Sequence, residues 1–526
     1  MKRKLSLVSA CDRSKNDSEV FIRVIRINYI AGVMKKGVQL ITYVDRIGCQ
    51  NIAELHDFVK SKLNGAISGI HILPFYYPID GEDAGFDPID HLQVDSRLGT
   101  WDDIKDLSSS VGVMADMIVN HVSALSPQFK DYMQKGEESD FAPMFLSYDK
   151  VFKNGATEEE LVQIYRPRPG FSFTPMRING SQNKKLIGTT FTQNQVDIDV
   201  HSKAGQHYLE NILDTFQKAG VTMIRLDAAG YAVKKRGTSC FMIEETFEFI
   251  AALAKKAHNR KMDVLVEIHS YYKTQIEIAK RVGYVYDFAL PVLVLDVIYN
   301  QRAENLLKWL EVSPRNAFTV LDTHDGIGVI DVASENGKPG LIPDNDLDQI
   351  VEEIHVRSKG KSRKATGAAA SNLDLYQVNC TYFEALGSDA YSYLIARAIQ
   401  FFCPGIPQVY YVGLFGDEND MELLSKTNVG RDINRHYYTH EEVERKLKSP
   451  IVRKLLELMT LRNTHASFHG EFDMSASSSS RLILSWANGS SVSRLDLNLD
   501  DWSVEIQYAN EENVGTIHFD EFLIEA

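Results

Sequence analysis

Three carboxylates in this sequence share one setting, because each lies at the end of a short apolar run. They are Asp227 in VTMIRLD, Glu267 in MDVLVEIH and Asp325 in AFTVLDTHD. Short, β-branched runs of this kind are typical of strands buried on both faces of a parallel sheet. Parallel α/β folds carry their active sites where such strands emerge. Three carboxylates from three strand ends therefore predict glycosyl chemistry.

Eight runs of this type alternate with helical patterns, which is the order that a (β/α) barrel requires. Helices are expected at 205–219, before the fourth run, and at 244–258, before the fifth. Eight parallel strands are the number that closes a TIM barrel. The predicted strands are 38–43, 69–75, 113–119, 221–226, 263–268, 284–288, 317–322 and 406–412.

The spacing of the runs predicts how the chain is divided. Long intervals after strands 3 and 7 predict an insert B at 120–199 and an insert B′ with an acceptor loop at 327–390, because long loops at this end give the fold its specificity. Short alternating runs then predict a C-terminal β domain at 466–526. The fold class is therefore α/β, a (β/α)8 TIM barrel with inserted subdomains after strands 3 and 7 and a C-terminal antiparallel β domain. The predicted barrel comprises 38–119, 200–326 and 391–465, after a poorly ordered extension at 1–37.

Composition excludes several classes of partner. The 526 residues carry a net charge of −14 and no basic cluster with interleaved aromatic residues, which argues against nucleic acid. No apolar run approaches the length of a membrane span. The five cysteines are scattered and form no CxxC pair, a pattern that favours a reducing, cytoplasmic compartment. Small molecules are the partners that remain.

Several segments carry a resemblance to a known family. Four of them resemble the signature regions of the α-amylase superfamily: DMIVNH at 116–121, RLDAAGY at 225–231, EIHSYY at 267–272 and LDTHDGIGVID at 321–331. Together with NLDLYQVN at 372–379 and GRDINRHYY at 430–438, they are similar more narrowly to the sucrose phosphorylase family. The likeness runs from about residue 38 to the end of the β domain.

The carboxylates suit a double displacement. Retaining glycosyl transfer uses two carboxyl groups about 5–5.5 Å apart, one as nucleophile and one as acid and then base. Their positions assign Asp227 as the nucleophile, Glu267 as the acid and base, and Asp325 as the group that holds the sugar hydroxyls and stabilises the transition state. Arg225 points to the same strand face as Asp227 and is expected to keep it ionised.

The resemblance implies further site residues. A phosphate acceptor needs fixed cations, and Arg168 is a candidate because prolines on either side stiffen its backbone. The implied donor-binding residues are Asp83, Phe86, His121, Phe191, Gln195, Arg225, His324 and Arg431. The implied acceptor or phosphate-binding residues are Arg168, Tyr231, His269, Leu373, Asp374, Tyr376 and Gln377.

The resemblance implies phosphorolysis of sucrose to α-glucose 1-phosphate and fructose. Three alternatives stay open: a phosphorylase for sucrose 6′-phosphate, glucosylglycerol or glucosylglycerate, a sucrose hydrolase or transglucosidase, and a non-catalytic amylase-like module. Asn120 matches a calcium-binding position of many amylases, but no Asp-rich loop flanks it, so neither a metal nor a cofactor is expected. A homodimer is a possible assembly, and a monomer is not excluded by the sequence.

Overall fold

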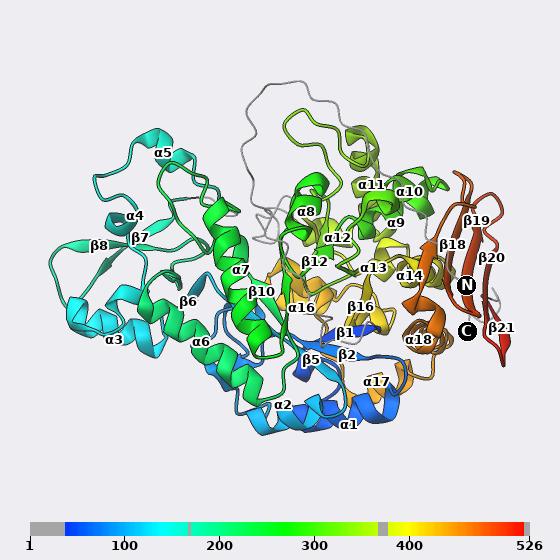
Figure 1. Ribbon diagram of the computed structural model, residues 1–526, viewed down its shortest axis with the longest axis horizontal. Helices are drawn as coiled ribbons and strands as arrows, with labels where there is room; N and C mark the ends of the chain where they lie inside the picture. The colour runs from blue at the N-terminus through cyan, green and yellow to red at the C-terminus, as the bar shows by residue number, and fades with distance from the viewer. Residues whose placement is uncertain (1–36, 167–169, 367–376, 520–526) are drawn as a thin grey trace, which may run out of the picture. The chain divides into compact units, whose positions relative to one another are not determined.

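A closed barrel of eight parallel strands forms the centre of the protein (Figure 1). The computed structural model describes residues 37–166, 170–366 and 377–519. Around the barrel the strands follow chain order, and the last pairs with the first, Gln39 opposite Gln408. The strands are β1 (Gln39–Thr42), β2 (Gly69–Ile72), β5 (Gly112–Ile118), β10 (Met223–Asp227), β11 (Asp263–Val266), β12 (Tyr284–Asp287), β13 (Ala317–Thr319) and β16 (Ile406–Tyr410).

All eight predicted strands are confirmed, but several end earlier than their apolar runs. Strand β11 ends at Val266, so Glu267 is the first residue beyond it. Strand β13 ends at Thr319, because its ladder to β16 pairs only Phe318 and Thr319. Residues 320–325 therefore lie beyond the paired part of this strand, and the unpaired segment ends at Asp325.

Helices between the strands cover the barrel, and the two predicted at 205–219 and 244–258 are confirmed as α6 and α7. Helix α6 begins after Ser202, whose hydroxyl accepts from the Gly205 amide, and buries an apolar stripe that includes Leu209 and Phe216. The covering helices are α1 (Ile52–Lys62), α2 (Trp101–Ser108), α6 (Lys203–Lys218), α7 (Glu244–Asn259), α8 (Tyr272–Ala279), α9 (Leu290–Asn300), α10 (Glu304–Val312), α14 (Ala390–Phe402) and α18 (Pro450–Thr464).

Smaller elements occupy the intervals between barrel strands and the segment that follows the last of them. After β5, the short strand β6 pairs antiparallel with β9 and sets His121 opposite Asp197 and Ser123 opposite Gln195. After β13, the strands β14 and β15 pair in the same way. The strands are β3 (Tyr76–Tyr77), β4 (Asp90–Val94), β6 (His121–Ser123), β7 (Phe173–Arg177), β8 (Lys184–Gly188), β9 (Gln195–Asp197), β14 (Ile327–Gly328) and β15 (Gln377–Val378). The helices are α3 (Pro127–Lys135), α4 (Tyr148–Val151), α5 (Glu158–Val162), α11 (Asp344–Arg357), α12 (Lys361–Lys364), α13 (Tyr382–Ala385), α15 (Tyr411–Leu414), α16 (Met421–Thr427) and α17 (His440–Lys446).

A five-stranded antiparallel sheet follows the barrel, as the sequence predicts (red in Figure 1). It packs on α14, where the Trp486 indole donates to the Phe402 carbonyl at 2.8 Å and the Phe402 ring lies 5.3 Å from that of Phe468. Its strands are β17 (Glu471–Asp473), β18 (Arg481–Asn488), β19 (Ser491–Asn498), β20 (Val504–Ala509) and β21 (Val514–His518). The exact limits of the barrel segments and inserts stay predictions.

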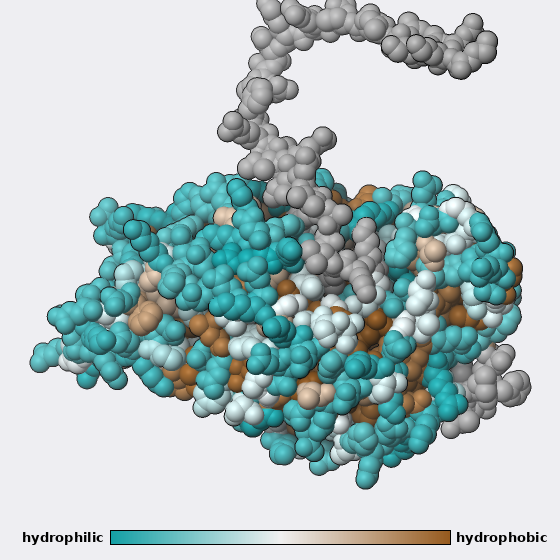
Figure 2. Space-filling model, turned by 60° about the horizontal axis from the view of Figure 1, so that its bottom comes forward, coloured by the Kyte–Doolittle hydropathy of each residue, from teal (hydrophilic) through white to brown (hydrophobic). Residues whose placement is uncertain are grey.

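The hydrophilic surface and the free cysteines are those expected from the amino-acid composition. Hydrophilic residues cover most of the face shown in Figure 2, and smaller hydrophobic areas lie between them. Within the described ranges, no helix has both the length and the apolar character needed to cross a bilayer. The four described cysteines, Cys49, Cys240, Cys380 and Cys403, are free and buried.

Candidate active site

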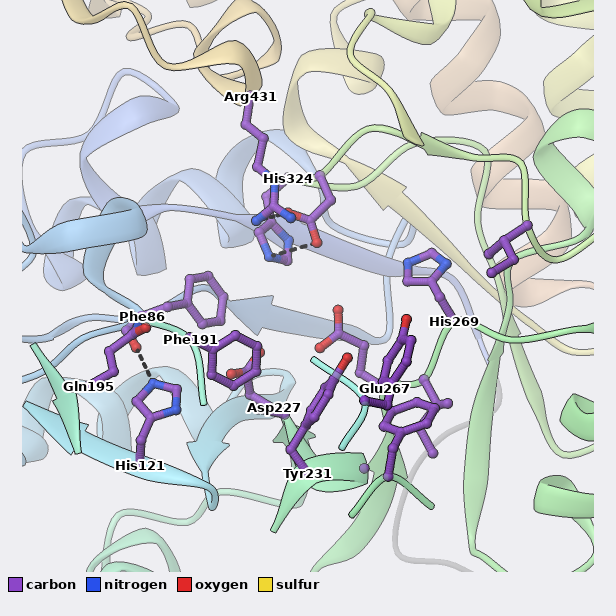
Figure 3. A pocket seen from close by; sticks show the side chains of 17 residues that line it. Phe86, His121, Phe191, Gln195, Asp227, Tyr231, Glu267, His269, His324 and Arg431 are labelled. Atoms are coloured by element: carbon purple, nitrogen blue, oxygen red, sulfur yellow. Dashed lines mark hydrogen bonds and ion pairs between the residues drawn. The ribbon is translucent and has the colours of Figure 1, made fainter. Parts of the chain in front are cut away.

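A cavity of about 140 Å³ lies where the barrel strands end, and its walls carry most of the predicted site (Figure 3). The three predicted catalytic carboxylates all face it, although they follow three different strands. The predicted residues that line it are Phe86, His121, Phe191, Gln195, Asp227, Tyr231, Glu267, His269, His324, Asp325 and Arg431. Distant sequence segments therefore meet where the strand-end argument places them.

Arg225 lies behind the cavity and connects three carboxylates. Its side chain is 2% exposed, and its guanidinium lies 2.5 Å from Asp116, 2.7 Å from Glu267 and 3.4 Å from Asp227. Asp116 is also held by His71 at 3.1 Å. The sequence predicts that Arg225 pairs with Asp227, but its guanidinium lies closer to the carboxylates of Asp116 and Glu267. One fixed cation thus positions both residues that the chemistry needs.

Asp227 lies next to Glu267 in the cavity. Burial, together with the neighbouring Glu267 charge and a hydrogen bond between the two carboxyl groups, raises the pKa of Asp227 well above its ordinary value of 3.8. The residue after Asp227, Ala228, has φ +54, a left-handed conformation that costs energy for a side chain with a Cβ and turns the chain sharply at the strand end.

Asp325 is kept ionised by cations on the opposite wall. Burial opposes its charge, but the guanidinium groups of Arg431, at 2.9 Å, and Arg435 outweigh burial and lower the pKa of Asp325. Arg435 also donates to the His324 carbonyl at 2.9 Å. Burial lowers the pKa of His324 to about 3, so this imidazole is neutral at physiological pH. The two walls therefore differ, because the pKa of Asp227 on one is raised and the pKa of Asp325 on the other is lowered.

Aromatic rings close one end of the cavity. Phe86 stacks on His324 with ring centroids 4.9 Å apart, and Phe191 meets His121 edge-on at 5.4 Å. The Arg225 guanidinium lies over the Phe86 ring at 5.3 Å. These contacts fix the rings and hold water away from the carboxylates, which strengthens electrostatic interactions there.

A second aromatic wall includes residues that the sequence analysis did not identify. The ring centroid of Tyr231 lies 5.1 Å from that of Phe191 and 4.8 Å from that of Phe241. The Tyr165 ring is parallel to that of Tyr231, with centroids 6.2 Å apart. Tyr165 opens the motif YRPRPG, so its neighbourhood was already marked, whereas no motif marks Phe241. Arg435 was also missed, although it lies in GRDINRHYY together with the predicted Arg431.

His269 enters the cavity beside Glu267. Its Nδ1 lies 2.8 Å from Asp331, and its ring stacks on Phe288 at 3.8 Å. Burial opposes a positive charge on the ring, but Asp331 together with Glu267 and Asp325 outweighs burial and raises the pKa of His269. Gln377 approaches the other ring nitrogen at 3.3 Å. An imidazole in this setting takes up a proton readily.

The remaining predicted residues do not line the cavity or cannot be placed. Gln377 is buried in β15 and reaches the cavity only through His269. Asp83 lies in the 3-10 helix Glu82–Gly85, and its side chain is outside the described part of the chain. The predicted residues that lie outside the described ranges are Arg168, Leu373, Asp374 and Tyr376.

The oxygen of Asn120, at the position considered for calcium, accepts a hydrogen bond from within the chain. The Lys234 ammonium donates to Asn120 Oδ1 at 2.9 Å and to the Tyr231 carbonyl, and lies 3.8 Å from Asp197. A lysine cation therefore balances the buried Asp197 at this point. In the described ranges, no three His, Cys, Asp or Glu side chains are grouped as a metal ion would require.

Similarity to known proteins identifies the class of protein to which this chain belongs. The α-amylase catalytic domain family matches residues 50–291. The solved structure of sucrose 6F-phosphate phosphorylase from Thermoanaerobacter thermosaccharolyticum superposes with a TM-score of 0.85 at 35% identity, covering 93% of this chain and 99% of that one.

Two relatives identify the family within this class. The chain is 60% identical to sucrose phosphorylase of Agrobacterium vitis over 455 residues, which are 86% of this chain and 93% of the relative. It is 50% identical to sucrose phosphorylase of Bifidobacterium adolescentis, covering 88% of this chain and 92% of the relative. The chain belongs to the sucrose phosphorylase family of enzymes with an α-amylase catalytic domain.

Proposed function

We propose that this protein catalyses the reversible phosphorolysis of sucrose to α-D-glucose 1-phosphate and D-fructose, with retention at the anomeric carbon. The observation that supports this most directly is the contact between the Asp227 and Glu267 carboxyl groups, with the Arg431-paired Asp325 on the facing wall. Inverting enzymes hold their two carboxyl groups about 6.5–9.5 Å apart to admit a water, so carboxyl groups in contact favour the retaining reaction. The identities of 60% and 50% to sucrose phosphorylases point to the substrate.

The first half-reaction forms a glucosyl-enzyme. Asp227 attacks the anomeric carbon of the glucosyl unit, Glu267 gives its proton to the departing fructose oxygen, and the carbon–oxygen bond to fructose breaks. This step requires a proton on Glu267 and a negative charge on Asp227, because Glu267 acts as the acid and Asp227 as the nucleophile. Arg225 contacts both carboxylates and balances this charge.

The second half-reaction reverses these roles. A phosphate oxygen attacks the anomeric carbon, Glu267 takes up the phosphate proton, and Asp227 leaves as a free carboxylate. Two inversions at one carbon give net retention, so the product is the α-phosphate. Asp325 is ionised throughout and stabilises the positive charge that develops on the sugar ring in both steps.

The cavity has two functional sides in this proposal. The donor side binds the glucosyl unit and consists of Phe86, His121, Phe191, Gln195, His324, Asp325 and Arg431 around the catalytic pair. The acceptor side binds fructose or phosphate and includes the described residues Tyr165, Tyr231, Phe241 and His269. Asp83, Arg168, Leu373, Asp374, Tyr376 and Gln377 complete the two sides as predictions from sequence. A cytoplasmic location and a homodimer likewise stay predictions.

A second candidate is a phosphorylase for sucrose 6′-phosphate, because the solved structure described above is of such an enzyme. Its 35% identity is well below the 60% and 50% of the two sucrose phosphorylases, so sucrose is the favoured substrate. The alternative of a non-catalytic module is disfavoured, because Asp227, Glu267 and Asp325 are all present and face one cavity.

The test uses purified protein with sucrose, in the presence and absence of inorganic phosphate. The proposal predicts glucose 1-phosphate and fructose in equal amounts when phosphate is present, with only slow release of free glucose without it. Free glucose at the same rate in both samples would identify a hydrolase. Turnover of sucrose 6′-phosphate but not of sucrose would establish the second candidate instead.

A further inference from the structure

His269 is held on three sides by residues that do not line the cavity. Its ring lies flat against Phe288, with centroids 3.8 Å apart and planes at 12°. Gly328 passes so close that a Cβ there would lie 3.0 Å from the His269 Cε1 atom. Asp331 holds Nδ1 at 2.8 Å. The imidazole can therefore neither rotate nor tilt, and its Nε2 edge has one fixed direction.

Asp331 is a buried carboxylate whose hydrogen bonds hold it beside the His269 ring. It is 1% exposed, and one carboxylate oxygen accepts from the Ser270 amide at 3.1 Å and from Gln275 at 3.4 Å. The other oxygen accepts from His269. Across the described ranges, His269 is the one side chain that forms an ion pair with Asp331. A buried carboxylate with a single partner of opposite charge strongly favours the protonated form of that partner.

The protonation site that remains variable is Nε2. The Asp331 carboxylate accepts a hydrogen bond, so Nδ1 carries a proton in both charge states of the ring. The Gln377 amide nitrogen lies 3.3 Å from Nε2, and its oxygen faces the Gly326 amide at 3.4 Å, an arrangement that suits a neutral Nε2 in the empty cavity. Three of the charges that act on the ring are those of Asp331, Glu267 and Asp325, and all three raise the pKa of His269.

We propose that Asp331 is a positioning residue for the acceptor side: it fixes the His269 ring in the cavity wall, and it favours a proton on Nε2, in place of the hydrogen bond from Gln377, when a phosphate dianion enters beside Glu267. This inference rests on the proposed function and extends it to the choice between acceptors. A dianion that approaches Asp227 and Glu267 meets negative charge, and an imidazolium held at this point offsets it. Water and fructose are uncharged and do not need that cation.

The decisive variant is Asp331→Asn, which keeps the shape of the side chain and removes its charge. The KM for phosphate should rise about tenfold or more, because a charge-assisted contact is lost, whereas hydrolysis of sucrose in phosphate-free buffer should stay within about threefold of wild type. A merely structural role would lower both rates together. Equal losses in phosphorolysis and hydrolysis would therefore overturn the proposal.

A double-mutant cycle tests whether the effect passes through His269. In a His269→Gln background, Asp331→Asn should change the KM for phosphate by less than about twofold, because the ring it serves is absent. Additive effects of the two substitutions would contradict the proposal. The matched control is Asp296→Asn in α9, a buried carboxylate held by Asn300, Asn305 and Arg302, which should leave the ratio of phosphorolysis to hydrolysis unchanged.

Gly328→Ala provides a second route if Asp331→Asn does not fold. A methyl group there would lie 2.9 Å from Asp331 Oδ2 and 3.0 Å from His269 Cε1, so it presses on the contact between them and should also raise the KM for phosphate more than it slows hydrolysis. An unchanged KM for phosphate in a folded Gly328→Ala enzyme would contradict the proposal. Wild-type enzyme measured alongside distinguishes failure of the proposed function from failure of the role of Asp331. If wild type forms no phosphate-dependent product, the proposed function is refuted. If wild type is active and the variants keep its KM for phosphate, only the role of Asp331 is refuted.

Discussion

The donor side and the acceptor side of the cavity are held by different forces. On the donor side, charge fixes the geometry: Arg225 bonds Asp116 and Glu267 at 2.5 and 2.7 Å, and Arg431 bonds Asp325 at 2.9 Å. On the acceptor side, ring contacts dominate, with the Phe241 ring centroid 4.8 Å from those of both Tyr231 and Tyr165. Tyr165 is 44% exposed, whereas Arg225 is 2% exposed.

This contrast separates the chemistry of the enzyme from its choice of acceptor. Buried ion pairs tolerate no loss of a partner, because the charge left behind is costly. Ring walls in loops contribute smaller, graded energies of about 0.5–1.5 kcal/mol per contact. Donor-side substitutions should therefore lower all reactions alike, whereas acceptor-side substitutions should alter one acceptor relative to another.

The largest expected effect is that of Asp227→Asn on the donor side. Loss of the nucleophile should lower kcat for phosphorolysis by about 10⁴-fold or more. The same variant should melt about 1–3 °C higher, because burial and Glu267 disfavour the charge that it removes. Glucose 1-phosphate release and a thermal melt measure the two effects. Activity within tenfold of wild type would contradict the assignment of the nucleophile.

The next effect is that of Asp325→Asn, which removes the permanent charge opposite the catalytic pair. We expect kcat to fall by about 10²–10³-fold, because a fixed carboxylate no longer stabilises the developing positive charge. The loss should be the same with phosphate and with water as acceptor, since Asp325 acts on the glucosyl unit. Parallel assays of both reactions measure this ratio. A loss that is confined to one acceptor would break the division between the two sides.

A smaller effect is expected for Tyr165→Ala on the acceptor side. The KM for fructose in the synthetic direction should rise about 3–10-fold, because an aromatic surface of the wall is lost. Hydrolysis of glucose 1-phosphate should change little, and Tyr165→Phe should behave as wild type because it retains the ring. Initial rates over a range of fructose concentrations give the KM. Slower hydrolysis in Tyr165→Ala would show that this ring also supports the donor side.

The smallest effect on catalysis is expected for Asp287→Asn, which tests a strand-end carboxylate outside the cavity. Burial raises the pKa of Asp287 to about 6, so the folded protein keeps its proton to higher pH than the unfolded chain does. The stability from this group is thus complete below about pH 3.9 and is lost as pH rises through about 6. The variant should therefore gain more in melting temperature at about pH 7.5 than at about pH 4.5, with unchanged kinetics. Equal gains at both pH values would show that this charge has no such cost.

Asp287 also shows what the sequence could predict and what it could not. Apolar runs specify barrel strands, so the eight strands were predictable, and so was the meeting of Asp227, Glu267 and Asp325 in one cavity at the strand ends. Asp287 ends β12 in the same way, yet its carboxylate accepts from the Trp309 indole at 3.0 Å and not from anything in the cavity. A strand end brings a side chain near the site, and only the packing around it decides which way it points.

Residues contributed by loops were less predictable for the same reason. Phe241 reaches the cavity because Cys240 and Met242 on either side take left-handed backbone conformations, which no periodic pattern reports. Asp331 was visible in LDTHDGIGVID, but its partner His269 lies 62 residues earlier. Long-range partners of this kind are fixed by tertiary packing, so their roles emerge only from the structure.

The central claim is that Asp227 carries the glucosyl unit while Glu267 moves the proton. The most direct test is to treat Glu267→Gln with α-glucosyl fluoride, whose leaving group needs no acid, and to record the intact mass and a peptide map. Our account predicts that an adduct of one glucosyl unit accumulates on the peptide that contains Asp227, because the base for its release is missing. Consumption of the fluoride with no adduct, or with an adduct on another residue, would contradict it.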